Sequence, residues 1–205
     1  GALDNVFRTL QTLPGVSAAE EFSSRLVVRG GAPDQNLTIM DGVEIHDPYR
    51  LFGLTSAFNP ETISRFELAT GGFSVKYGDR LSSLLSVENR DGTRDRPFAG
   101  SGSLSITDGN IVLEGKLPGS VPGSWLVTGR RTYYDLIAGK VTGDDFPGFA
   151  DLQAKGVWEP SQGQKLTLFG LRSRQAAAFT IDDESAQGEF QDDTENDLAW
   201  VRFDA

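Results

Sequence analysis

The sequence has no cysteine and a single histidine, His46. The absence of cysteine excludes disulfide bonds, thiolate zinc ligands and a cysteine nucleophile. One histidine cannot supply the two or three imidazole ligands of a zinc site within one chain. We therefore expect neither a cofactor nor a resident metal ion.

Basic residues and long apolar runs are also scarce. The 19 lysines and arginines are outnumbered by 29 acidic residues, which gives a net charge of −10. This balance does not favour nucleic acid as a partner, because its binding depends on neutralising phosphates with basic side chains. No apolar run reaches the roughly 18 residues that a transmembrane helix needs. A membrane-spanning β-barrel, whose strands are short and alternate in polarity, remains compatible with the sequence.

Residues 3–97 mix one helical pattern with short strand patterns. Val6, Leu10 and Leu13 recur at helical spacing, and Pro14-Gly15 is expected to end that helix. The remaining predictions for this segment are strands over 25–30 and 37–40 around a turn at 31–36, a turn at Asp41-Gly42, one helical turn over 61–66, and strands at 68–69 and 84–89.

Residues 98–178 change to an alternation of apolar and polar side chains, which is typical of strands that separate two media. The clearest runs lie near 98–107, 110–117 and 150–158, with noisier ones at 125–134 and 165–174. Short turns are predicted at 118–123 and 160–164, and outer loops at 107–109, 138–148 and 180–195. Residues 179–197 hold eight carboxylates and no basic residue, so we predict a solvated loop there, with alternation resuming over 198–205.

Several ordered motifs resemble the plug domain of TonB-dependent outer-membrane receptors. They are NVFRTLQTLPGV at 5–16, LVVRGG at 26–31, TIMDGVEIHDP at 38–48, and the long closing motif at 59–92. The run SWLVTGRRTYYDL at 124–136 is similar to an early barrel strand of the same family. The resemblance implies an α+β plug globule over residues 1–97. It also implies that residues 98–205 form the first antiparallel β-strands, about six, of an incomplete transmembrane β-barrel.

The resemblance further implies a function and a location. Receptors of this family lie in the cell outer membrane, bind a nutrient at the surface and import it through the plugged barrel. The implied partners are the TonB energy-transducing complex, outer-membrane lipid and an unknown nutrient ligand, and no enzymatic activity is expected. The chain shows no TonB-box segment and too few strands for a closed barrel, so we expect it to be a fragment of a longer receptor. The motifs GGAPDQN and GDRLSS most resemble those of the SusC-like, carboxypeptidase-regulatory-domain-bearing branch.

The resemblance also points to site residues in the loops at the plug apex. The residues expected to face the ligand are Asp34, Gln35, Asn36, Tyr49, Arg50 and Phe52. The alternative is that Phe52 only packs under the barrel wall. The family's usual arginine in the closing motif is Thr70 here, so contact between plug and barrel is expected from Arg29 or Arg80 instead.

Other chemistry was weighed against simpler interpretations. The acidic run 180–197 offers oxygen ligands for Ca²⁺ but lacks the spacing of a calcium loop. His46 lacks a nucleophile or oxyanion motif nearby and is expected to make local hydrogen bonds. Among 29 carboxylates some will pair by chance, so no glycosidase is inferred. Arg130 and Arg131 should point to opposite sides of a strand, which argues against one cationic platform with Tyr133.

The alternation also predicts which side chains share a face. Those expected toward lipid are Leu104, Ile111, Leu113, Trp158, Val201 and Phe203, and those expected toward the interior are Ser103, Glu114, Gln153 and Lys155. Six strands leave two unpaired edges, so edge-to-edge self-association of the chain is expected. The alternative functions are a plug-type binding or signalling module without transport, and a soluble all-β hydrolase.

Overall fold

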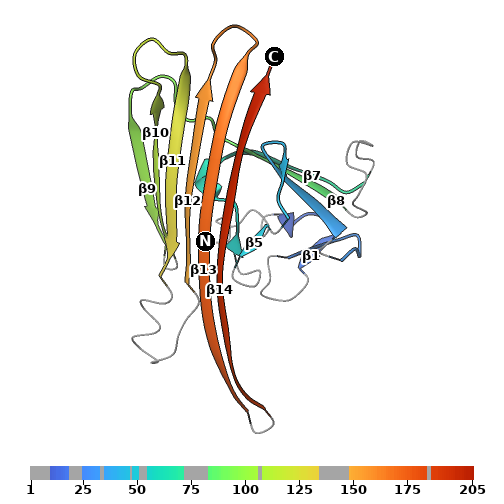
Figure 1. The fold of residues 1–205 in the computed structure, drawn as a ribbon. Coiled ribbons are helices and arrows are strands. Elements are labelled where there is room, and N and C mark those ends of the chain that lie inside the picture. The colour runs from blue at the N-terminus through green and yellow to red at the C-terminus, as the bar shows by residue number, and fades with distance from the viewer. Residues whose placement is uncertain are drawn as a thin grey trace. The chain divides into compact units, whose positions relative to one another are not determined.

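The computed structural model describes residues 10–18, 25–32, 35–46, 48–50, 55–71, 83–105, 108–133, 148–183 and 186–205. The chain divides into two compact units, Gly1–Arg90 and Asp91–Ala205 (Figure 1). Residues 91–97, which the sequence interpretation grouped with the plug, therefore belong to the second unit by their contacts. In the part of the chain that is described, no helix has both the length and the apolarity to cross a membrane.

The first unit is built from small sheets. Its main sheet has the strand order β4-β3-β8-β7. Strand β3 (Asn36–Met40) runs parallel to β8 (Ser83–Asn89), whereas β4 (Val43–Glu44) and β7 (Ile63–Ala69) pair antiparallel with their neighbours. The other pairs are β1 (Val16–Ala18) with β2 (Leu26–Val28), and β5 (Tyr49–Arg50) with β6 (Thr55–Ser56). The buried apolar core of this unit includes Leu10, Leu26, Val28, Leu37, Ile39, Met40, Phe58, Leu85 and Val87.

The turn between β3 and β4 follows directly from its two residues. Asp41 and Gly42 take φ values of +49° and +87°, the left-handed pair that a two-residue hairpin turn requires. The Asp41 carboxylate accepts hydrogen bonds from the backbone N and the side-chain Nδ2 of Asn89, at 2.9 and 3.1 Å. The Asp-Gly turn expected from the sequence is therefore confirmed, and its carboxylate joins the hairpin to the end of β8.

The helical turn expected over 61–66 is correct only in its first residues. Pro60–Thr62 form a 3-10 helix, η3, whose first turn is capped by the Asn59 side chain accepting from the Glu61 N–H. Strand β7 begins at Ile63. The reason is pairing with β8, which supplies hydrogen-bond partners that a second helical turn would have to forgo.

The N-terminal elements agree with the sequence where they are described. Leu10 is helical and buried, and Gly15 has φ +77°, so the helix stop at Pro14-Gly15 is confirmed. The predicted strands at 25–30 and 37–40 correspond to β2 and β3. These two strands pair with other partners rather than with each other.

The second unit is one antiparallel sheet of six strands in sequence order, β9 to β14 (Figure 1). The strands are β9 (Ala99–Leu104), β10 (Asp108–Lys116), β11 (Gly123–Thr132), β12 (Gly148–Trp158), β13 (Lys165–Asp183) and β14 (Ala186–Asp204). The turns predicted at 118–123 and 160–164 lie where β10 and β12 end. The described elements are almost all strands, and they form the expected order of a small globule followed by one antiparallel sheet.

The two faces of this sheet differ in chemistry and in exposure. Residues directly opposite each other in an antiparallel pair share a face, so the register sorts every side chain. We call one the apolar face; its exposed large side chains are Leu104, Ile111, Leu113, Leu152, Trp158, Leu168, Val201 and Phe203. We call the other the polar face; its buried side chains include Asn110, Thr128, Arg130, Asp151, Gln153, Lys155 and Ser173. The predicted alternation is confirmed, with Ser103 and Glu114 also on the polar face.

The acidic run was predicted as a loop, and that prediction is wrong. Strand β13 extends to Asp183 and β14 starts at Ala186, so only two residues separate them. Carboxylates in the described part of β14 pair with the neighbouring strand: Arg174 lies 2.9 Å from Asp193, and Arg172 lies 2.9 Å from Glu195. The charge run looked unpaired in sequence because its cations lie about 20 residues earlier.

Candidate functional site

The predicted ligand residues of the plug have structural hydrogen bonds where they are described. The Asn36 Nδ2 donates to the Leu26 carbonyl at 2.8 Å, and its Oδ1 accepts from the Ser83 hydroxyl at 2.7 Å. The Gln35 Oε1 accepts from the Ala32 N–H at 3.2 Å. Asn36 thus links β2 to the start of β8, and Gln35 closes a local turn.

Tyr49 also contacts the β2 strand. Its hydroxyl accepts a hydrogen bond from the Leu26 N–H at 3.1 Å, and the residue pairs with Ser56 through β5 and β6. Arg50 is described only in its backbone, as part of β5. Asp34 and Phe52 lie outside the described residues. The ligand role of all these residues stays a prediction.

Arg29 directly follows β2, in a turn. Its φ is +51°, its backbone N–H donates to the Gly15 carbonyl at 2.9 Å, and its guanidinium lies beside Gly71. These contacts are inside the first unit. Arg80, the other candidate for contact between plug and barrel, lies outside the described residues, so that contact also stays a prediction.

A buried ion pair lies on the polar face between β11 and β12. The Arg130 Nε donates to the Asp151 Oδ2 at 2.8 Å, and the two side chains are only 6% and 1% exposed. The Arg130 guanidinium also lies 4.9 Å from the centre of the Phe149 ring, a cation–π distance. Arg131 is exposed on the opposite face, so the expected split of the two arginines is confirmed.

Further polar atoms on this face are buried without a hydrogen-bond partner among the described residues, and two of them lie in almost fully buried side chains. They are the Gln153 Nε2 and the Ser173 Oγ, in side chains that are 1% and 2% exposed. An unsatisfied buried amide or hydroxyl costs about 1–3 kcal/mol. Water or a polar solute at this face would hydrogen-bond the amide and the hydroxyl and remove this cost. The two unsatisfied groups are therefore consistent with a face that water reaches.

The second unit begins with a charged cluster centred on Asp91. Its carboxylate lies 3.0 Å from the Lys155 Nζ and 2.6 Å from the Lys165 Nζ, and Arg94 lies at 3.6 Å. Arg94 also pairs with Glu159 at 2.8 Å. Burial alone would raise the pKa of the Asp91 carboxyl, but the hydrogen bonds and charges of the two lysines outweigh burial and lower it.

Backbone contacts hold the same segment on the sheet. The Ser124 hydroxyl donates to the Asp91 carbonyl at 2.6 Å, and the Lys116 N–H donates to the Arg96 carbonyl at 2.9 Å. Gly92 has φ +87° and lies so close to the Trp125 carbonyl that a Cβ would not fit. Residues 91–97 therefore form a strap that is fixed to β10, β11 and β12 by side chains and backbone together.

The sequence interpretation missed this cluster and the buried ion pair. Lys155 was placed on the correct face by its alternation, but its partner is 64 residues away, as the pairing of Asp91 with Lys155 shows. One signal could have indicated the ion pair: Arg130 and Asp151 are opposite charges, each within a strand that also contains apolar residues. The His46 Nδ1 lies 3.6 Å from the Glu44 Oε1, and the His46 side chain is 85% exposed. The described residues contain no group of three or more acidic or histidine side chains that could hold a metal ion.

A comparison with protein families matches most of the first unit. Residues 2–83 match the TonB-dependent Receptor Plug Domain family. This part of the chain is therefore similar to the plug domain of TonB-dependent receptors. No curated protein matches the chain.

Solved structures extend the likeness beyond the plug. The siderophore receptor PirA from Acinetobacter baumannii superposes with a TM-score of 0.62 at 17% identity, over 86% of this chain and 30% of that one. A ferric enterobactin receptor (PfeA) mutant from Pseudomonas aeruginosa gives 0.59 at 17% identity, over 86% and 31%. The copper transporter OprC gives 0.65 at 15% identity, over 98% and 31%.

These likenesses show the fold: a plug followed by the first strands of an outer-membrane receptor barrel. The chain spans about 30% of the length of these receptors. In the solved structures this fold is that of an outer-membrane receptor, and the apolar face of β9–β14 is exposed in this chain. The neighbouring structures are named as siderophore receptors and a copper transporter. Placement in the SusC-like branch rests on the sequence motifs alone.

Proposed function

We propose that this chain is the plug and early barrel of a receptor that binds a nutrient at the cell surface and imports it. One observation carries the proposal: a plug domain is followed by six strands whose apolar face is exposed and whose polar face is buried. This inverts the arrangement of a water-soluble protein. It is the arrangement of a transmembrane barrel with a polar interior.

The polar face would line the path of the imported solute. Its ion pair between Arg130 and Asp151 keeps two charges off the lipid side, and the buried polar groups of Gln153 and Ser173 suit a wet interior. The plug would bind ligand through Asp34, Gln35, Asn36, Tyr49, Arg50 and Phe52, with Arg29 or Arg80 contacting the barrel. The TonB complex would supply the energy, and the protein would have no enzymatic activity.

The substrate class is proposed from two sequence motifs. GGAPDQN at 30–36 and GDRLSS at 78–83 favour the SusC-like, carboxypeptidase-regulatory-domain-bearing branch, and hence a larger nutrient such as a glycan or a peptide. The structural neighbours named as siderophore and copper receptors are 13–18% identical to this chain, so they support the fold rather than a metal chelate as substrate.

The test is an uptake measurement in cells that produce the complete receptor. Labelled oligosaccharide, labelled peptide and an iron chelate are supplied separately, to cells with and without TonB. We expect accumulation of the oligosaccharide or the peptide inside cells, and its loss when TonB is removed. Binding at the surface without import in cells that have TonB would instead support the binding or signalling module.

A further inference from the structure

The strap of residues 91–97 begins with a carboxylate that two strands hold at once. The Asp91 carboxylate lies 3.0 Å from the Lys155 Nζ of β12 and 2.6 Å from the Lys165 Nζ of β13. The Asp91 backbone carbonyl also accepts a hydrogen bond from the Ser124 hydroxyl of β11 at 2.6 Å. Polar atoms of one residue thus attach the start of the strap to three neighbouring strands.

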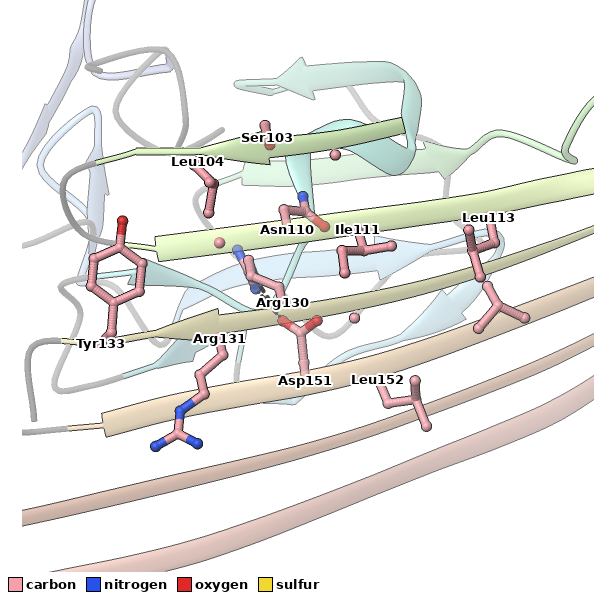
Figure 2. Close-up of a pocket in the computed structure, with 14 residues that line it drawn as sticks. Ser103, Leu104, Asn110, Ile111, Leu113, Arg130, Arg131, Tyr133, Asp151 and Leu152 are labelled. Atoms are coloured by element: carbon pink, nitrogen blue, oxygen red, sulfur yellow. Dashed lines mark hydrogen bonds and ion pairs between the residues drawn. The ribbon is translucent and has the colours of Figure 1, made fainter. Parts of the chain in front are cut away.

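Both lysines are on the polar face of the sheet. Lys155 lies four residues after Asp151 on β12, so the two side chains point to the same side, and Figure 2 shows Asp151 facing Arg130 there. Lys165 lies on this side of β13 as well, four residues before Phe169, which pairs with Lys155. The strap therefore contacts the polar face, at the end of the sheet where β12 and β13 are joined by a short connection.

The two ends of the strap are held in different ways. At the later end, the Lys116 N–H donates to the Arg96 carbonyl at 2.9 Å, and the chain continues directly into β9. At the Asp91 end, the charged side chains of Asp91 and Lys165 are 24% and 32% exposed. Water and salt weaken ion pairs that solvent reaches. The Asp91 end is therefore the end that can release.

Lys165 is the more exchangeable of the two cations. Among the described residues, Asp91 is the only carboxylate that Lys165 pairs with. Lys155 is 4% exposed and makes a further interaction besides the one with Asp91. A dissolved anion can thus approach Lys165 from its exposed side while Lys155 stays covered. The group that fits between the two lysines is a single carboxylate, as Asp91 itself shows.

We propose that Lys155 and Lys165 form a carboxylate-binding site that Asp91 occupies as a built-in ligand. A carboxylate on the imported solute, such as a peptide or an acidic sugar carries, displaces Asp91 and frees this end of the strap. The displacement rests on the proposed function, because in a barrel receptor the short connections lie at the periplasmic end, where an imported solute leaves. A solute confined in the barrel can compete with a tethered residue, since confinement also gives it a high effective concentration.

The first test replaces the built-in ligand by a free one. Asp91→Ala in the complete receptor removes the carboxylate and leaves space for formate. Hydrogen–deuterium exchange of peptides covering residues 91–97 measures whether the strap is held. We expect faster exchange in Asp91→Ala, and recovery with sodium formate but not with sodium chloride at the same ionic strength. Adding Lys165→Gln should weaken formate binding about tenfold, the equivalent of one hydrogen bond to a charged group.

Lys116→Gln is the matched control, because Lys116 is an exposed lysine of the same sheet whose side chain lies outside the Asp91 cluster. It should change neither the exchange of the strap nor the recovery with formate. Lys165→Gln alone should also speed exchange over 91–97, so the site is tested even if Asp91→Ala folds poorly. Exchange that formate does not slow, or slows equally without Lys165, would overturn the site.

The second test adds small probes to the unaltered receptor at about 100 mM, well above the millimolar effective concentration of a ligand on a short tether. N-acetylalanine and glucuronate carry the carboxylate of a peptide and of an acidic sugar, and N-acetylalanine amide and glucose are their uncharged counterparts. We expect the acids alone to speed exchange over 91–97, and a response to one acid only would identify the solute as peptide or sugar. No response to either acid, or an equal response to the uncharged probes, would overturn the displacement. No import is measured here, so this result is independent of the uptake experiment.

Discussion

Asp91 concentrates several stabilising contacts in one carboxylate. It contacts Lys155 and Lys165, whose side chains are 4% and 32% exposed, and its own side chain is 24% exposed. Replacing it by asparagine keeps the shape and removes the charge that both lysines face. We expect Asp91→Asn to lower the free energy of unfolding by about 2 kcal/mol, as for hydrogen bonds to charged groups. Chemical denaturation of the receptor in lipid vesicles measures it, and Asp95→Asn is the exposed control.

The same residue gives a pH dependence. Because the pKa of Asp91 is lowered below its ordinary value of 3.8 in the folded protein, the charged form stabilises the fold at every pH above that value. The contribution disappears as the pH falls below 3.8 and the folded carboxyl is protonated. The gap in stability between the unaltered receptor and Asp91→Asn should close in that acid range. A gap that stays constant down to pH 2 would contradict the assignment.

Two arginine–carboxylate pairs provide a matched comparison of burial. Arg130 and Asp151 are buried, whereas Arg174 and Asp193 are 61% and 47% exposed. Breaking a buried pair leaves an uncompensated charge and costs about 3–5 kcal/mol, whereas an exposed pair contributes about 0–1 kcal/mol. We expect Arg130→Ala to destabilise the barrel several-fold more than Arg174→Ala in the same denaturation assay. Equal losses would mean that the polar face is hydrated enough to screen the buried pair.

Tyr49 separates a structural role from a ligand role. Its hydroxyl accepts from the Leu26 N–H, whereas stacking on a ligand would use its ring. Tyr49→Phe should weaken the plug and spare ligand affinity, and Tyr49→Ala should also cost at least about 1 kcal/mol of binding. Titration of the receptor with its imported nutrient measures this. Unchanged affinity in Tyr49→Ala and Arg50→Ala, with Arg29→Ala failing to fold, would leave these residues only a structural role.

At the scale of elements, alternation was the most informative signal in the sequence. The runs from Ala150 to Trp158 and from Asn110 to Leu117 placed the strands and both faces correctly, because a membrane barrel confronts two media. The turn Asp41-Gly42 was equally clear, since its left-handed φ values restrict the residue types. Local chemistry dictated these features, so the sequence was sufficient to predict them.

Features that depend on distant partners could not be predicted in this way. Ile63–Phe66 follow a proline and suggest a helix, but pairing with β8 makes them a strand. The acidic residues of β14 suggest a loop until Arg172 and Arg174 are placed opposite them. The Asp91 cluster joins positions 64 and 74 residues apart. In each case the stabilising partner is fixed by the register of the sheet, which no local pattern specifies.

The apolar face gives a prediction about membrane depth. Leu113 lies on the apolar face, opposite Gly100 of β9 and Val127 of β11. Replacing it with arginine puts a charge into hydrocarbon and should cost about 2–4 kcal/mol of barrel stability near the midplane. Glu114→Arg, one residue along and on the polar face, is the control. Unfolding in vesicles should show a much smaller loss for the control, and the reverse order would invert the assigned faces.

For the molecule as a whole, the two sheet edges dominate behaviour. Among the described strands of the sheet, β9 and β14 have one neighbour each, and an unpaired edge recruits other strands. A protein limited to these 205 residues should therefore form oligomers or aggregates in buffer, and should not insert into vesicles as a monomer. Light scattering coupled to size-exclusion chromatography tests this. A monodisperse monomer without detergent would contradict the expectation.

The longest hairpin extends beyond the wall that it helps to build. The first residue of β12, Gly148, pairs with Ala176 of β13. Residues 177–183 and 186–192 therefore continue beyond β12 as a two-stranded ribbon of roughly 23 Å. Among the described residues, this ribbon has no third strand beside it, so each of its two strands has one backbone edge without a neighbouring strand.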